Sequence, residues 1–173
     1  PTIVSRNADL DLAAEGVMRS AFGLQGQKCS ATSHVFVEKP VYDAFVSKLV
    51  ANTSAIQIGD PTEQENWFGP VINRKAYQDY GNYVAELAAA GTILTGGKQL
   101  IEGELAKGFY CAPTVVADVP LGHRLWKEEM FLPIVMVTPV DDLKQAMELA
   151  NDVDYGLTAG FVGTPDETEW FFD

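Results

Sequence analysis

Ile134-Val135-Met136-Val137 is the stretch of sequence that decides the fold. Four consecutive apolar residues with no polar residue between them are typical of a strand that is covered on both faces. Such a strand belongs to a layered α/β protein with a mainly parallel sheet, because helices must cover each side of it. Residues 133–138 are therefore predicted to form an inner strand.

Helical and strand patterns alternate along the rest of the chain. Apolar residues at helical spacing predict helices at residues 9–22, from Pro40 through Leu49, and at residues 73–90, 142–150 and 166–173. Further strands are predicted at residues 33–38, 92–95, 113–119 and 158–162. We predict one domain of the α/β class over residues 1–173, with a mainly parallel sheet flanked by helices.

Composition and charge exclude several classes of protein. The 173 residues carry 24 acidic and 12 basic side chains, a net charge of −12, and the bases form no stripe. Such a chain is repelled by phosphate backbones, so nucleic acid is not an expected partner. No apolar run approaches the roughly 20 residues that a membrane-spanning helix needs, so no membrane is expected either. Two cysteines do not make a disulfide scaffold, and they favour a reducing compartment.

Cys29 stands out for its local sequence. It follows a predicted helix and two glycines, Gly23 and Gly26, and it precedes a strand. Lys28 is adjacent, and a nearby cation favours the thiolate. A buried structural cysteine is nevertheless the commoner fate of a lone cysteine, so both interpretations stay open on residue chemistry alone. Cys111 lies in an apolar, strand-like setting, the two histidines are not evident partner bases, and no cluster has the spacing of metal ligands.

Five segments resemble signatures of the aldehyde dehydrogenase superfamily, and they occur in family order. They are Gly26-Gln27-Lys28-Cys29-Ser30-Ala31, Gly69-Pro70-Val71-Ile72, Gly108-Phe109-Tyr110-Cys111-Ala112-Pro113-Thr114-Val115, Glu128-Glu129-Met130-Phe131-Leu132-Pro133-Ile134 and Asn151-Asp152-Val153-Asp154-Tyr155-Gly156-Leu157. The resemblance covers essentially the whole chain. It implies the catalytic-domain fold of that family.

The resemblance also implies a mechanism and a set of site residues. Cys29 is the implied nucleophile, which attacks an aldehyde to give a thiohemiacetal and then a thioester. NAD is the implied cofactor, with NADP as the alternative; Glu129 is implied to contact the ribose of its nicotinamide half, and Phe131 to pack beside that half. On position alone, a solvated glutamate and a core phenylalanine remain the alternative. Leu132 departs from the pattern, because the family usually has glycine there.

The same resemblance implies that the chain is a fragment. The family's general base and its cofactor domain precede the segment that begins at Pro1, so residues 1–173 are expected to be the nucleophile-bearing catalytic domain without the cofactor domain. The fragment alone is expected to be inactive. The parent is expected to be a homo-oligomer in the cytoplasm, or in the mitochondrial matrix if it is eukaryotic.

Residues 24–31 point to one branch of the family. They most resemble the enzymes that oxidise glutamate γ-semialdehyde to glutamate in proline catabolism, in which the serine after the nucleophile contacts the substrate carboxylate. Ser30 matches that serine. Three alternatives stay open: another semialdehyde dehydrogenase, such as one for succinic semialdehyde; a non-enzymatic protein that kept the fold; and a cysteine hydrolase, for which no base is evident.

Overall fold

Strand β5 (Ile134–Val140) lies inside a six-stranded sheet, as its apolar sequence predicts. The computed structural model describes residues 1–172. The strand order is β3-β4-β5-β2-β1-β6, with β1 at Thr2–Val4, β2 at His34–Glu38, β3 at Thr92–Thr95, β4 at Thr114–Ala117 and β6 at Gly160–Val162. Only the β3–β4 pair is antiparallel among the described pairs, so the predicted α/β class with a mainly parallel sheet is confirmed.

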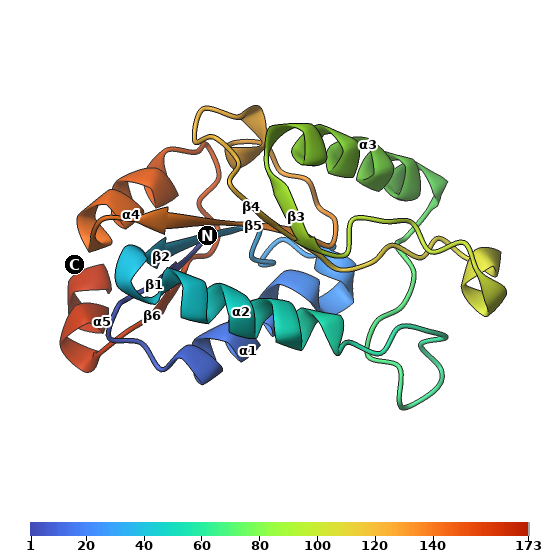
Figure 1. Cartoon of the computed structure of the whole chain (residues 1–173), viewed down its shortest axis with the longest axis horizontal. Coiled ribbons are helices and arrows are strands. Elements are labelled where there is room, and N and C mark those ends of the chain that lie inside the picture. Colours follow the sequence, from blue (N-terminus) through green and yellow to red (C-terminus); the bar gives the residue numbers. More distant parts are fainter. Residues whose placement is uncertain (173) are drawn as a thin grey trace.

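Helices cover both faces of the sheet (Figure 1). Helices α1 (Leu10–Phe22) and α2 (Tyr42–Ser54) lie on one face, and α3 (Arg74–Ala90) and α4 (Leu143–Asn151) lie on the other. Successive residues of β5 alternate between two cores, because neighbouring side chains of a strand point to opposite faces. Ile134 and Met136 join the core beneath α3 and α4, whereas Val135 and Val137 join the core beneath α1 and α2.

Polar side chains define where the helices begin. Asp9, Asn73 and Asp142 each accept a hydrogen bond from a backbone N–H in the first turn of α1, α3 and α4. Such caps satisfy donors that have no partner within the helix. Helix α3 ends before Gly91, where a Cβ atom would lie 2.4 Å from the backbone oxygen of Ala117. Glycine is needed there for this close approach to β4.

Several predicted boundaries change in the structure. Strand β4 is shorter than residues 113–119, because Pro113 has no N–H and Asp118 has a φ of 59°. Residues 39–41 form a 3₁₀ turn before α2. The three-residue strand β1 was not predicted, since it is too short to show a pattern. Helix α5 (Pro165–Phe172) forms as expected, and the last residue of its predicted range, Asp173, lies outside the described residues.

The loops before the parallel strands lie along one edge of the sheet. Strands β1, β2, β5 and β6 run in the same direction, so their amino ends share that edge. The segments that enter them include residues 23–33, 124–133 and 152–159. The sheet therefore brings three of the motif segments together from distant parts of the sequence.

Candidate active site

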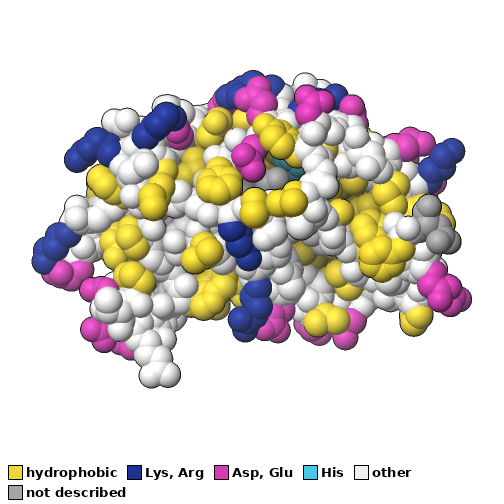
Figure 2. Space-filling model, turned by 180° about the vertical axis from the view of Figure 1, so that it is seen from behind, with side chains coloured by type: hydrophobic (Ala, Val, Ile, Leu, Met, Phe, Trp, Pro, Cys, Tyr) yellow, Lys and Arg dark blue, Asp and Glu magenta, His cyan; other side chains and the backbone are white. Residues whose placement is uncertain are grey.

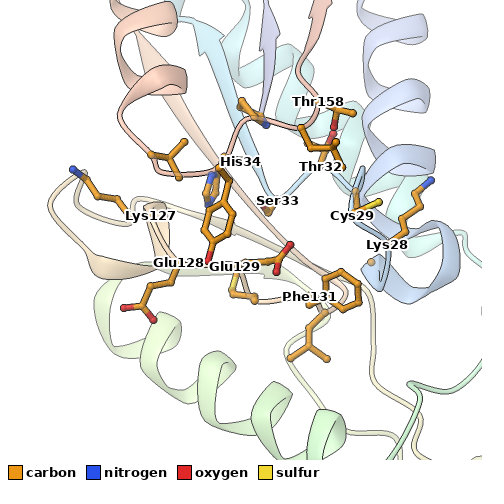
Figure 3. Close-up of a pocket in the computed structure, with 18 of the residues that line it drawn as sticks. Lys28, Cys29, Thr32, Ser33, His34, Lys127, Glu128, Glu129, Phe131 and Thr158 are labelled. Carbon is orange, nitrogen blue, oxygen red and sulfur yellow. The ribbon is translucent and has the colours of Figure 1, made fainter.

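A cavity of about 330 Å³ opens at this edge, and Cys29, Glu129 and Phe131 all line it (Figure 3). The three side chains come from two loops that are about a hundred residues apart in sequence. Its other lining residues include Lys28, Thr32, Ser33, His34, Lys127, Met130, Leu132, Tyr155 and Thr158. The structure thus brings together the proposed nucleophile and both proposed cofactor contacts.

The loop that carries Cys29 is a strained turn. Helix α1 is followed by the short 3₁₀ segment η1 (Gly23–Gly26), in which Leu24 and Gln25 have φ values of 52° and 58°. Gly26 continues the left-handed turn with a φ of 68°, and a Cβ atom there would lie 2.4 Å from the backbone oxygen of Leu132. Non-glycine residues held in this region cost about 1–3 kcal/mol each and cluster at functional sites.

The two cysteines have opposite environments. Cys29 is exposed, whereas Cys111 is fully buried. Burial raises the pKa of the Cys111 thiol to about 12, because a thiolate there would be poorly solvated. The Nζ atom of Lys28 lies over Gly23, at 3.4 Å from the position that a Cβ atom of that residue would occupy. Of the two thiols, only that of Cys29 is accessible to an aldehyde.

The segment around Phe131 supplies the opposite wall. Phe131 has a φ of 55° and its side chain is 42% exposed, so the ring is available for stacking. Both Glu128 and Glu129 line the cavity; the carboxylate of Glu129 points toward its centre (Figure 3), whereas that of Glu128 pairs with Arg124. Leucine stands at position 132 where the family usually has glycine. It fits there because the left-handed backbone conformation is at Phe131 and not at Leu132. The Leu132 side chain is buried and packs into the core beneath α3 and α4.

His34 lies at the start of β2 and also lines the cavity. Its Nε2 atom is 3.0 Å from the carbonyl oxygen of Leu125, and its ring centroid is 5.2 Å from that of Trp126. Burial lowers the pKa of His34 to about 4, so the imidazole is neutral and donates to Leu125. These contacts give His34 a structural role, and the ring additionally forms part of the cavity wall.

Ser30 stands apart from the other predicted site residues. It lines an adjacent groove with Thr32 and Thr158, and it is absent from the lining of the Cys29 cavity. Two residues further along, the Thr32 hydroxyl is hydrogen-bonded to those of Thr2 and Ser20, at 3.0 and 2.8 Å. The side chains of Cys29 and Ser30 therefore face neighbouring but different hollows.

Sequence reasoning assigned no site role to several cavity residues. Tyr155 belongs to the motif at 151–157, yet only the structure shows that it lines the cavity with Lys127 and Thr158. The sequence did contain a signal for this grouping, because the loops that carry Cys29, Glu129 and Tyr155 each come directly before a predicted strand. In a parallel sheet, such loops meet at one edge.

Neither a metal site nor a membrane-spanning helix is found among residues 1–172. Within residues 1–172, no three His, Cys, Asp or Glu side chains gather as metal ligands would. Of the helices described, none combines the length and apolar character that crossing a bilayer requires. On the side seen in Figure 2, basic side chains are scattered among acidic ones, and among the side chains coloured there they form no continuous stripe.

Comparison with known proteins identifies the family. The family model described as the aldehyde dehydrogenase family matches residues 1–171. The chain belongs to the aldehyde dehydrogenase family. Among curated aldehyde dehydrogenases, it is 41% identical over 160 residues to 1-pyrroline-5-carboxylate dehydrogenase 1 of Halalkalibacterium halodurans, and 39% identical to the 1-pyrroline-5-carboxylate dehydrogenase of Bacillus subtilis. Each match covers 92% of this chain but 30% of the relative.

Solved structures of the family have the same fold. A 1-pyrroline-5-carboxylate dehydrogenase from Thermus with bound NAD superposes with a TM-score of 0.90 at 38% identity, covering 98% of this chain and 32% of that one. A betaine aldehyde dehydrogenase from Staphylococcus aureus in complex with NAD+ gives a TM-score of 0.94 at 28% identity, covering 99% of this chain and 35% of that one. The present chain thus corresponds to about a third of these aldehyde dehydrogenases.

Proposed function

We propose that the chain is the nucleophile-bearing part of a longer, NAD-dependent dehydrogenase that oxidises glutamate γ-semialdehyde to glutamate. The main observation in support is that Cys29, Glu129 and Phe131 line one cavity in a chain of the aldehyde dehydrogenase family. The substrate is chosen because curated relatives near 41% identity are 1-pyrroline-5-carboxylate dehydrogenases. The chain spans about 30% of their length, so the activity belongs to the longer enzyme.

Cys29 performs the covalent chemistry in this proposal. Its thiolate attacks the aldehyde carbon, and the resulting oxyanion accepts a hydrogen bond from the backbone N–H of Cys29. The exposed position of the thiol at the cavity supports this role. The base for thioester hydrolysis and the second oxyanion donor are proposed to come from outside residues 1–173.

The cavity has suitable groups for the nicotinamide half of NAD. The Glu129 carboxylate can accept hydrogen bonds from ribose hydroxyls, and the exposed Phe131 ring offers a flat apolar surface. When bound, NAD accepts the hydride that the aldehyde carbon loses. NAD is favoured over NADP in the proposal because two related structures were solved with NAD.

Exposed apolar side chains beside the cavity support a longer enzyme. Phe131, Tyr155 and Leu157 are 42%, 59% and 68% exposed, and all three line the cavity. Neighbouring apolar side chains of this size are usually covered by another surface. We propose that the cofactor domain of the same enzyme covers them.

The test is to supply the purified full-length enzyme with NAD and glutamate γ-semialdehyde and to follow NADH by absorbance. Turnover that Cys29→Ala abolishes is the expected result, with residues 1–173 alone giving none. Faster turnover of succinic semialdehyde would change the substrate assignment. Turnover that survives Cys29→Ala would refute the nucleophile.

A further inference from the structure

We infer that Gln27 is a positioning residue that fixes the nucleophile loop through the hydrogen bond from the Ile72 N–H to the Gln27 side chain. The Oε1 atom of Gln27 accepts this bond at 3.0 Å. Gln27 is two residues before Cys29, and Ile72 is 45 residues further along the chain. The inference deepens the proposed function and rests on Cys29 being the nucleophile.

The loop needs such a tether because its turn is strained. Leu24, Gln25 and Gly26 are consecutive left-handed residues, and two of them are not glycine. Strained backbone of this kind persists only where surrounding contacts hold it. Two backbone bonds after the turn are local to the loop: Gln27 N–H to the Leu24 oxygen at 3.0 Å, and Ala31 N–H to the Lys28 oxygen at 3.1 Å.

Gln27 provides the link between this turn and a fixed part of the fold. Within residues 1–172, the bond to Ile72 is the one hydrogen bond that joins residues 27–31 to a segment outside the loop. The anchor is itself held, because Val71 is buried and its N–H donates to the Phe109 oxygen at 2.9 Å. A loop tied to a fixed segment keeps its conformation.

The other end of the loop is tied as well. Thr32 is buried, and its hydroxyl is bonded to those of Thr2 on β1 and Ser20 on α1. Cys29 lies between the ties at residues 27 and 32, so the backbone that carries it is held on both sides. Misplacing a reacting atom by about 1 Å costs on the order of a hundredfold in rate. Loss of the tie at Gln27 therefore affects the reaction more than it affects aldehyde binding.

Three variants of the full-length enzyme test the inference. Gln27→Leu removes the acceptor, Gln27→Glu keeps an oxygen that can accept from the Ile72 N–H, and Gln78→Leu makes the same change in an exposed side chain on α3, away from the nucleophile loop. For Gln27→Leu, kcat should fall about tenfold to a hundredfold with little change in KM. Gln27→Glu should recover most of that loss, and Gln78→Leu should behave as the unsubstituted enzyme.

Hydrogen exchange gives a readout that does not depend on dehydrogenase activity. Removing a hydrogen bond worth about 1 kcal/mol should accelerate amide exchange at Ile72 and in residues 24–31 by roughly fivefold in Gln27→Leu. An enzyme without activity on any aldehyde would contradict the proposed function. Amide hydrogen exchange would still show whether the Gln27 side chain holds the loop. Unchanged exchange or unchanged kcat in Gln27→Leu would overturn the inference, and so would a Gln27→Glu variant as impaired as Gln27→Leu.

Discussion

The imidazole of His34 donates from Nε2 to the carbonyl oxygen of Leu125, 3.0 Å away, and it remains neutral in the folded chain. The pKa of His34 is lowered to about 4 by burial, against 6.5 for an accessible histidine. As pH falls from 6.5 to 4, the unfolded chain binds a proton here and the folded chain does not. The contribution of this histidine to stability is therefore complete above pH 6.5 and is lost through that window.

This difference predicts a pH dependence of the unfolding free energy. Between pH 7 and pH 5, His34 should account for a loss of about 2 kcal/mol, since one pKa unit corresponds to about 1.4 kcal/mol. His34→Gln keeps an N–H donor but does not titrate, so its unfolding free energy should fall less over the same range. Urea unfolding of both chains at the two pH values measures this. Parallel losses would show that carboxylates dominate the acid sensitivity.

Alkylation should distinguish the two cysteines. Limiting iodoacetamide is expected to modify Cys29 and to leave Cys111 unmodified, because Cys111 is buried and its pKa is raised to about 12. Peptide mapping by mass spectrometry locates the label. Cys29→Ser should abolish labelling in the native chain, and urea should expose Cys111. Preferential modification of Cys111 in the native chain would contradict the assignment.

Glu129→Gln should slow the chemical step of the full-length enzyme. A weaker contact to the ribose misplaces the cofactor, so the single-turnover rate of NADH formation is expected to fall more than substrate binding weakens. Glu128→Gln is the matched control, because Glu128 borders the same cavity but its carboxylate is engaged with Arg124. An unchanged single-turnover rate in Glu129→Gln would remove this residue from the cofactor site.

Ser30→Ala tests recognition of the substrate carboxylate. A hydrogen bond to a charged group contributes about 1.5–3 kcal/mol, so kcat/KM for glutamate γ-semialdehyde should fall roughly tenfold to a hundredfold. An aldehyde of similar length without the carboxylate and amine should lose less. Ser30 lines the groove beside the Cys29 cavity and not the cavity itself. The comparison of the two aldehydes therefore decides whether its hydroxyl reaches the substrate carboxylate. Equal losses for the two aldehydes would mean that Ser30 acts on the loop instead.

Gly26→Ala should destabilise the chain. The φ of 68° and the 2.4 Å approach of a Cβ atom to the Leu132 oxygen together predict a loss of at least about 1–2 kcal/mol. Gly16→Ala is the control: Gly16 lies exposed within α1, a Cβ atom there meets nothing within 4 Å, and alanine should stabilise the helix by about 1 kcal/mol. Urea unfolding of both variants measures the contrast, and equal stabilities would show that the turn relaxes.

Long apolar patterns predicted the fold well. The run at 134–137 correctly indicated a strand covered on both faces, and the helix at 74–90 begins at a cap, Asn73, that the predicted range includes. The short strands β3 and β6 were also predicted, whereas the three-residue β1 was missed because so short a segment shows no periodicity. Boundaries moved where backbone geometry prevails over composition, as at Asp118.

The candidate site was predictable only in part. Motif resemblance selected Cys29, Glu129 and Phe131, which line one cavity. It could not select Gln27, because the partner of that side chain is a backbone N–H 45 residues away. The left-handed backbone at Phe131, rather than at Leu132, was also hidden, since it depends on how two loops meet.

The two edge strands, β3 and β6, have consequences for how this chain aggregates. They are four and three residues long, and the pairing of β3 shifts register between Ile93 and Thr95. Short or irregular edges present few free backbone groups to a neighbouring chain, so they are poor templates for amyloid-like growth. Association of concentrated samples should instead proceed through exposed side chains such as Tyr155 and Leu157. Such aggregates should dissolve on dilution and should not bind cross-β dyes.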